Sequence, residues 1–276
     1  MNNSREMAVG GLFYPQVSSE LKVLFEDWFA NNKQEPPRDL IPRAMILPHA
    51  GYVYSGEVAA TGYQLWSAVN NNKQLQNIKT VIVMGPAHRV AFSGIATVGF
   101  DSLKTPFGQL EVDIELRDEL ANKFDQVAIS DYAHASEHSI EVHLPFIKNL
   151  LPSVKVLPLL NGQVTAEEVS EVLKSLWQRE DVYFVISSDL SHFHSYFEAQ
   201  AIDQETANMI NQSSWKTLSG ERACGYKGIQ GLLALQPQTP LQIEQLQVIN
   251  SGDTAGDRSS VVGYGAWAIY EGGKSI

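Results

Sequence analysis

Three histidines occupy positions from which they could act together in metal binding or proton transfer. His49, His88 and His192 each follow a short apolar segment, in turns rich in glycine, proline or serine. Imidazole is a common metal ligand, and it changes its charge near neutral pH, so it suits both tasks. A single such histidine would ordinarily be a satisfied loop residue, but three in equivalent positions favour one shared site.

The segments that precede these histidines are predicted to be buried strands. Ala44–Leu47, Thr80–Met84 and Val182–Ile186 are apolar runs of strand length. In open α/β sheets, ligands bind beyond the carboxyl ends of the strands. We therefore expect the three loops to converge although they are far apart in the sequence. The third loop also carries Asp189, which adds a carboxylate to the predicted site.

Cys224 is the only cysteine, which excludes an intrachain disulfide and a structural zinc site built from several cysteines. It lies just before a short predicted helix, Gly228–Leu235. A thiol near a helix N-terminus is expected to have a lowered pKa, which suits a metal-binding or reactive thiolate. The alternative is a buried, inert cysteine, the usual fate of a single one. The spacing alone does not choose between them.

A further group of ionisable side chains lies in the middle of the chain: His134, Glu137, His138, Glu141 and His143. His134 and His138 are four residues apart, as are the two glutamates. On one helix, each pair would share a face. A charged first helical turn is the simpler interpretation of Glu137. We expect Glu137 and His138 either to support the side chains that form the main site, without binding the metal themselves, or to contact the substrate.

The remaining pattern predicts an α/β fold, with a central mixed or mostly parallel sheet flanked by helices on both faces. We expect one domain over residues 1–276 and a loop at Asn31–Asp39, after a helix at Ser19–Ala30. The other expected helices are Ser55–Ala68, Glu111–Lys123, Glu137–Leu150, Ala166–Trp177 with Thr165 as its N-cap, and Phe197–Asn211. The other expected strands are Ile95–Val98, Val154–Leu159, Gln245–Asn250 and Val262–Tyr270.

Composition argues against several classes of function. The formal net charge is −11 with no dense basic block, so nucleic acid and anionic membrane surfaces are not expected partners. The apolar runs are too short to span a bilayer, and the N-terminus lacks the pattern of a signal peptide. We expect a cytoplasmic protein. Phosphate-binding glycine loops and the Gly-x-Ser-x-Gly elbow do not occur in the sequence.

Five motifs, in order along nearly the whole chain, resemble the Memo-like family. They are Pro48–Tyr52, Gly85–His88, Glu137–Phe146, Ser187–Asp189 with His192, and Cys224–Gly225. The family is similar in fold to the class III extradiol dioxygenases, which cleave catechol-type rings with non-haem iron. The resemblance therefore implies that fold, and a metal site at the carboxyl end of the strands.

The resemblance also implies roles for individual residues. His49 and His88 resemble the two imidazole ligands of the dioxygenases, and Cys224 stands where those enzymes have a carboxylate ligand. His192 resembles their acid/base histidine, with Asp189 beside it. Side chains that resemble pocket walls are Phe13 and Tyr54. Two histidines and one carboxylate suit Fe(II). Fe(II) is therefore the expected metal. Copper or zinc are the alternatives, because a thiolate is softer than the carboxylate it replaces.

Three functions follow from these residues. The first is a metal-dependent, dioxygenase-like oxidoreductase in which His49, His88 and Cys224 hold iron or copper and His192 moves a proton. The second is a metal-free hydrolase with Cys224 as nucleophile, His192 as base and Asp189 as the orienting group. The third is a binding protein that captures a peptide or small molecule in the same pocket, with help from Arg89. The residue types favour the first, and the oligomeric state is not predicted.

Overall fold

Four parallel strands at the centre of the protein are buried along almost their whole length. They are β2 (Ala44–Leu47), β9 (Val182–Ser187), β3 (Thr80–Pro86) and β8 (Lys155–Asn161), hydrogen-bonded in that spatial order. Strands with both faces covered by helices need apolar residues at every position, because neither face meets water. This explains their unbroken apolar runs. The computed structural model describes residues 3–32, 41–67 and 77–272.

Shorter or edge strands extend this core into a mixed sheet of nine strands within the described residues, ordered β10-β12-β2-β9-β3-β8-β4-β7 with β11 paired to β12. The added strands are β10 (His192–His194), β12 (Val261–Glu271), β11 (Leu241–Asn250), β4 (Ile95–Thr97) and β7 (Val127–Ile129). Strand β12 runs antiparallel to β2, and β4 runs antiparallel to β8. A small separate sheet holds β1 (Ser4–Arg5), β5 (Ser102–Thr105) and β6 (Gly108–Glu111).

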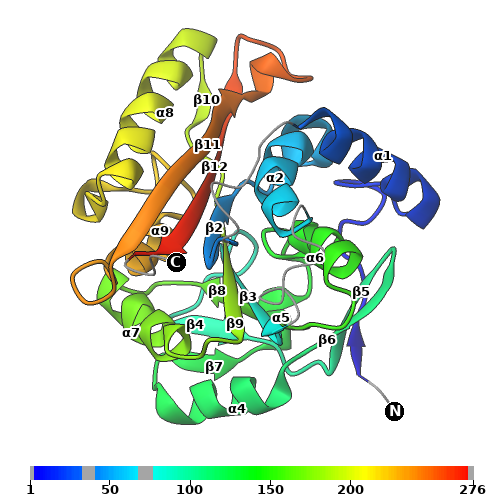
Figure 1. The fold of residues 1–276 in the computed structure, drawn as a ribbon, viewed down its shortest axis with the longest axis vertical. Coiled ribbons are helices and arrows are strands. Elements are labelled where there is room, and N and C mark those ends of the chain that lie inside the picture. The colour runs from blue at the N-terminus through cyan, green and yellow to red at the C-terminus, as the bar shows by residue number, and fades with distance from the viewer. Residues whose placement is uncertain (1–2, 33–40, 68–76, 273–276) are drawn as a thin grey trace.

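Helices lie on both sides of the large sheet, as Figure 1 shows. One group is α1 (Ser18–Asn31), α2 (Tyr52–Ser67) and α6 (Leu144–Leu150). The other is α7 (Ala166–Trp177), α8 (Tyr196–Asn211) and α9 (Tyr226–Leu233). The other helical segments are α4 (Ile114–Lys123), α5 (Asp131–His134), η1 (Glu141–His143), η2 (Trp215–Thr217) and η3 (Ser251–Asp253). The predicted α/β fold class, a large mixed sheet flanked by helices, is confirmed.

Most of the expected elements are present, with bounds shifted by a few residues. The Thr165 cap of α7 is present as a capping box, in which the Glu168 side chain also accepts the Thr165 backbone N–H. The expected helix Glu111–Lys123 begins only at Ile114, because Glu111 ends strand β6. The predicted loop Asn31–Asp39 lies, from residue 33 onward, outside the described residues, as does Ala68.

The prediction of one helix over Glu137–Leu150 is wrong in its first half. Residues 137 and 138 are irregular and lie between two turns, a short 3-10 helix follows, and the α-helix begins only at Leu144. The cause is Glu137, whose side chain accepts the backbone N–H groups of His138 and Ser139. A side chain that binds its own neighbouring N–H groups competes with helical hydrogen bonding.

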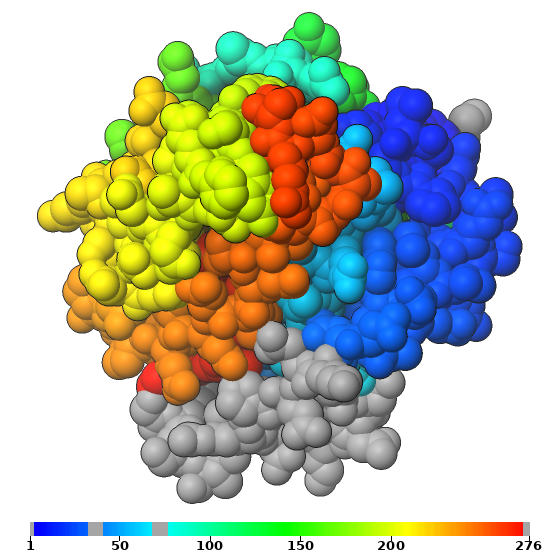
Figure 2. Space-filling model, turned by 90° about the horizontal axis from the view of Figure 1, so that it is seen from above, coloured from blue at the N-terminus to red at the C-terminus, as the bar shows by residue number. Residues whose placement is uncertain are grey.

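Segments that are distant in the sequence form the upper face of the molecule, seen in Figure 2. There the start of α8 lies against the segment between η3 and β12, and the Tyr196 N–H donates to the Arg258 carbonyl at 3.1 Å. None of the described helices combines the length and the apolar composition that a bilayer crossing requires.

Candidate metal centre

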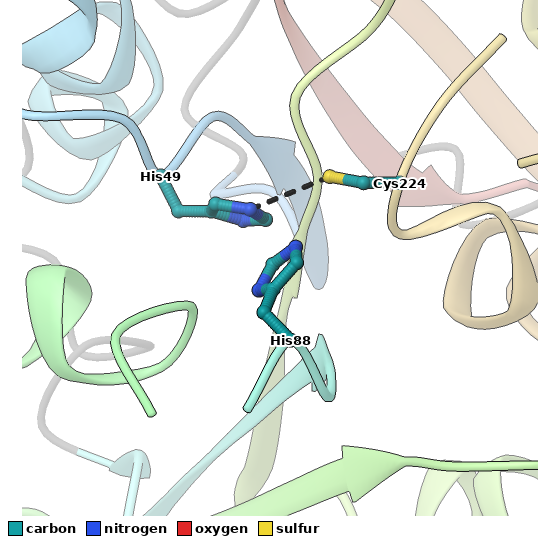
Figure 3. A group of neighbouring side chains, drawn as sticks. All are labelled: His49, His88 and Cys224. Atoms are coloured by element: carbon teal, nitrogen blue, oxygen red, sulfur yellow. Dashed lines mark hydrogen bonds between the residues drawn. The ribbon is translucent and has the colours of Figure 1, made fainter. Parts of the chain in front are cut away.

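The loops that follow β2 and β3 meet at one end of the parallel strands. Leu47 at the end of β2 pairs in register with Ser187 at the end of β9, which in turn lies beside β3. His49 and His88, which follow β2 and β3, therefore face each other across the end of β9. The loop before α9 brings Cys224 to the same place, and Figure 3 shows the thiol directed at the His49 ring. The ligand atoms of these three side chains all lie within 4.8 Å of one another.

His49 is buried, with 1% of its surface exposed, and both its backbone and its ring are anchored. Its N–H donates to Asp189 Oδ1 at 2.7 Å, and its Nδ1 lies 2.6 Å from Ser187 Oγ. The other ring nitrogen, Nε2, lies 3.4 Å from Cys224 Sγ. Burial, followed by the positive potential of His88 and His138, lowers the pKa of His49 well below its usual value. The ring is therefore neutral at physiological pH, which is the form that binds metals.

His88 is more exposed and is held by a carboxylate. Its Nδ1 lies 3.0 Å from Glu137 Oε1, and its backbone N–H donates to Glu137 Oε2 at 2.6 Å. Burial would favour the protonated acid, but hydrogen bonds from the His88 ring and from the N–H groups of Ser139 and His88 outweigh it. They hold the pKa of Glu137 far below its usual range. A charged Glu137 then accepts the Nδ1–H of His88 and leaves Nε2 free for a ligand.

The same carboxylate explains why His88, Glu137 and His138 make a poorer metal site than the first set. Their ligand atoms also lie within 4.8 Å of one another. However, Glu137 Oε1 already faces the N–H groups of His138 and Ser139 at 2.9 and 3.0 Å, besides the His88 ring. Glu137 Oε2 accepts the backbone N–H groups of His88 and Arg89. With both oxygens occupied, Glu137 positions His88 and the following turn, and it has little capacity left for a substrate.

The environment of Cys224 differs from the one expected from the sequence. Its Sγ accepts the Asp189 N–H at 3.3 Å, and the residue is only partly exposed. Helix α9 does begin two residues later, at Tyr226. Yet burial, and then the Asp189 carboxylate, raise the pKa of the thiol well above its usual value. The predicted lowering is therefore wrong for the metal-free protein, because desolvation and a nearby negative charge outweigh the helix terminus.

Gly225 lets the cysteine loop approach the end of β9. A Cβ at this position would lie 2.3 Å from the Ser187 carbonyl oxygen, which is far inside van der Waals contact. The Gly225 N–H donates to Ser188 Oγ at 2.9 Å, and the Cys224 N–H donates to the Asp189 carbonyl. A residue without a side chain is thus required for the thiol to reach the histidines.

Asp189 and His192, the predicted acid/base pair, lie on the loop after β9. Asp189 is buried, and its hydrogen bonds go to His49 and Cys224 rather than to His192. Burial raises the pKa of Asp189, and the positive potential of His192 opposes that shift. His192 also acts electrostatically on His49, so it lies near the pocket, in strand β10. Asp189 therefore orients the His49 backbone, a role that differs from orienting His192.

The predicted pocket walls surround the imidazoles. The Phe13 ring lies 4.8 Å from the His138 ring, which in turn stacks on His88 at 4.8 Å. Tyr54, in the first turn of α2, is partly exposed and lies close to Gly51 of the His49 loop. Phe13 and His138 therefore line the site, whereas Tyr54 lies beside the His49 loop.

His134 and Glu141 lie away from the pocket. His134 and His138 do not share a helix face, because α5 ends at His134. His134 is a buried histidine whose Nε2 lies 2.9 Å from the Ala96 carbonyl. Glu141 is buried with Arg5 at 2.7 Å and also accepts the Tyr14 hydroxyl at 2.8 Å. These two residues anchor the N-terminal segment to the core.

Sequence reasoning missed the polar groups behind His49. Ser187 and His143 occur in motifs singled out above, but no role was assigned to them, and Tyr63 was not noticed at all. Ser187 Oγ lies 2.6 Å from His49 Nδ1 and 3.0 Å from His143 Nε2. A polar residue at the last position of a buried apolar strand was the available signal for Ser187. Tyr63 gave no such signal, because it lies on a helix face that is apolar elsewhere.

Comparisons with known proteins identify the family of the chain. Residues 5–268 match the family described as "Memo-like protein". A "MEMO1 family protein" of Aquifex aeolicus is 33% identical over 277 residues, covering 94% of this chain and 97% of the relative. One from Methanocaldococcus jannaschii is 33% identical over 296 residues, covering 98% and 100%. One from Nitrosopumilus maritimus is 29% identical over 277 residues, covering 95% and 98%. The family predicted from the motifs is confirmed: the chain belongs to the Memo-like protein family.

Proposed function

We propose that this protein is a metal-dependent oxidoreductase, similar to a dioxygenase, whose metal is held by His49, His88 and Cys224. The observation that carries the proposal is the convergence of two imidazole nitrogens and one sulfur within 4.8 Å at the end of the parallel strands. Residues so far apart in the sequence rarely bring three ligand atoms this close unless the cluster has a shared task. Fe(II) is the metal we favour, with copper or zinc as alternatives.

The donor set fits a metal ion on chemical grounds. His49 and His88 each have Nδ1 engaged, by Ser187 and Glu137, which leaves Nε2 of each ring available as a ligand. Burial raises the pKa of the Cys224 thiol, and a bound cation would supply the charge that favours the thiolate. A bound iron would supply one-electron redox chemistry and open positions for oxygen and substrate.

The surrounding residues have tasks that do not depend on the identity of the metal. His192, which lies near the pocket in strand β10, is the residue to which we assign proton transfer there. Asp189 holds the His49 loop through the backbone N–H at 2.7 Å. The rings of Phe13 and His138 form an apolar and aromatic wall against which a small substrate would pack.

The metal-free hydrolase receives less support from the geometry. Its nucleophile would need a nearby base, but the ring 3.4 Å from Cys224 Sγ is that of His49, whose pKa is lowered by burial. The raised pKa of Cys224 also opposes formation of a free thiolate. The hydrolase would in addition leave His88 and its buried carboxylate without a role. The single cysteine is consistent with our proposal of a cytoplasmic, reducing location.

The test is Fe(II) binding by the purified, untagged protein under anaerobic conditions. We expect one Fe(II) per chain in the parent, and its loss in His49→Ala and Cys224→Ala. The matched control is His194→Ala, because His194 is a partly exposed histidine whose Nδ1 pairs with Glu198 outside the cluster. Equal metal content in the parent and in Cys224→Ala, or no binding of Fe(II), copper or zinc by the parent, would refute the proposal.

A further inference from the structure

A line of buried polar side chains extends from His49 into the core, away from the pocket. The His49 Nδ1 lies 2.6 Å from Ser187 Oγ, and the same oxygen lies 3.0 Å from His143 Nε2. On its far side, His143 Nδ1 lies 3.1 Å from the Tyr63 hydroxyl. Ser187 also donates to the Ser139 carbonyl at 2.5 Å. Each of these side chains is buried, so protein groups rather than bulk water must satisfy them.

Counting donors and acceptors leaves one consistent arrangement of hydrogens. A serine hydroxyl has one hydrogen, and the Ser187 hydrogen goes to the Ser139 carbonyl. Towards both imidazoles, Ser187 Oγ must therefore accept. His49 then carries its hydrogen on Nδ1 and His143 carries its hydrogen on Nε2. The remaining nitrogen of His143 is an acceptor, and the Tyr63 hydroxyl donates to it.

The arrangement requires the two inner groups to be neutral, and burial keeps them so. Burial, followed by the positive potential of His49, lowers the pKa of His143 to about 3. Burial also raises the pKa of Tyr63 well above its usual value. A neutral imidazole and a neutral phenol each have one hydrogen to place, so the chain cannot reverse its direction without leaving a buried group unpaired.

We propose that Tyr63, His143 and Ser187 are positioning residues that hold His49 in the tautomer with hydrogen on Nδ1. The lone pair of Nε2 is then fixed toward the pocket, where Cys224 Sγ lies at 3.4 Å. The tautomer itself follows from the hydrogen bonds alone. The importance of this tautomer for metal binding rests on the proposed function, in which His49 is a metal ligand. Glu137 does the corresponding task for His88, but it does so with a single charged contact rather than a neutral chain.

The direct test uses the metal-free parent protein with nitrogen-15 in its histidine rings. We expect the His49 signals to show a protonated Nδ1 and an unprotonated Nε2, and the His143 signals to show the opposite. A His49 ring protonated on Nε2, or a His143 ring protonated on Nδ1, would overturn the proposal. This readout involves no metal, so it can succeed even if the proposed function fails.

Variants test whether the chain causes the tautomer. In Ser187→Ala, both imidazoles lose their shared acceptor, and we expect His49 to become a mixture of tautomers. We expect Co(II), added as a probe, to bind about 10- to 100-fold more weakly, as for other residues that orient a ligand. Ser187→Thr keeps the hydroxyl and should restore the tautomer. An unchanged His49 tautomer in a folded Ser187→Ala protein, or Co(II) binding within twofold of the parent, would contradict the proposal.

A milder variant covers the case in which Ser187→Ala fails to fold. Tyr63→Phe removes only the hydroxyl that donates to His143, and we expect His143 to lose its single tautomer and Co(II) binding to weaken severalfold. The matched control is Tyr52→Phe, which removes an equally buried hydroxyl that donates to the Val142 carbonyl at 2.6 Å. The proposal falls if Tyr63→Phe leaves the His143 tautomer unchanged, or if Tyr52→Phe alters it equally.

Discussion

The two imidazoles of the candidate centre are held by opposite chemistry. His49 is buried, with its side chain 2% exposed, and its Nδ1 meets a neutral hydroxyl backed by a neutral chain. His88, with its side chain 29% exposed, meets the buried Glu137 carboxylate. A carboxylate at Nδ1 of His49 would lose its hydration, which is costly unless several hydrogen bonds replace it. Glu137, whose side chain is 1% exposed, has such a replacement in four backbone N–H groups, which stabilise its charge. The same ligand orientation is thus obtained in two environments by two means.

This contrast predicts that removing the charge beside His88 has the largest effect. Glu137→Gln keeps the shape but places an amide among groups that all donate hydrogens. We expect Fe(II) affinity to fall about 100-fold, because the carboxylate orients His88 and raises its basicity. Anaerobic titration with Fe(II) measures this. Glu198→Gln, which removes the charge that pairs with His194 outside the cluster, should bind as the parent does. If Glu137→Gln binds Fe(II) as tightly as the parent, the charge of Glu137 does not contribute to metal binding by His88.

The position of Cys224, the third proposed ligand, should change in a variant that leaves both histidines in place. Gly225→Ala adds a Cβ that would lie 2.3 Å from the Ser187 carbonyl oxygen, so the Cys224 loop must move. Overpacking of this kind costs about 2 kcal/mol of unfolding free energy. We expect that loss in urea denaturation, together with weaker Co(II)–thiolate absorption. Gly220→Ala is the control, because its nearest neighbour to a new Cβ is the edge of a side chain, Tyr226, at 3.4 Å. Full thiolate absorption in Gly225→Ala would show that the close approach is not needed.

The difference in exposure predicts different reactivity of the two rings. Diethyl pyrocarbonate acylates accessible neutral imidazole nitrogens. We expect His88, with an accessible Nε2, to react at least about tenfold faster than the buried His49, whose opening must precede reaction. Peptide mapping by mass spectrometry gives both rates, with His194 as the exposed reference. Equal rates for His49 and His88 would mean that the buried side of the pocket opens readily.

A smaller effect, on the pH dependence of the unfolding free energy, is expected from His134, which is buried outside the pocket. Burial lowers the pKa of His134 to about 4, whereas in the unfolded chain it is near 6.5. The unfolded state therefore binds more protons below pH 6.5, and stability falls as the pH falls from 6.5 toward 4. The contribution of this residue is about 1 kcal/mol between pH 6.5 and pH 5.5. In His134→Gln we expect a shallower decline of the unfolding free energy over that interval. An identical decline in parent and variant would refute this assignment.

The positions of the site residues along the chain could be predicted, whereas their anchors could not. Buried parallel strands have an unmistakable apolar pattern, and polar residues after β2 and β3 gave His49 and His88 directly. Glu137 was expected to support the ligands, but its partner could not be identified, because His88 is 49 residues away. The break in the helix was not predicted either, because it follows from Glu137 accepting the neighbouring N–H groups. The pKa of Cys224 was mispredicted for a similar reason, since the depth of burial is a property of the assembled fold.

Several short strands were also not predicted from the sequence. Strands β1, β5, β6 and β7 have two to four residues, too few to show a period in the sequence. They are defined by the strands with which they pair, and β1 depends on the contacts of Arg5 with Glu141. Tyr63 likewise looks like any aromatic residue on an apolar helix until His143 is found 3.1 Å from its hydroxyl.

X-ray absorption at the iron edge of the anaerobically Fe(II)-loaded protein tests the central claim most directly. We predict a first coordination shell with one sulfur and two imidazole nitrogens in the parent, and the loss of the sulfur alone in Cys224→Ser. A parent spectrum with only nitrogen and oxygen neighbours would contradict the assignment of His49, His88 and Cys224 as one metal centre.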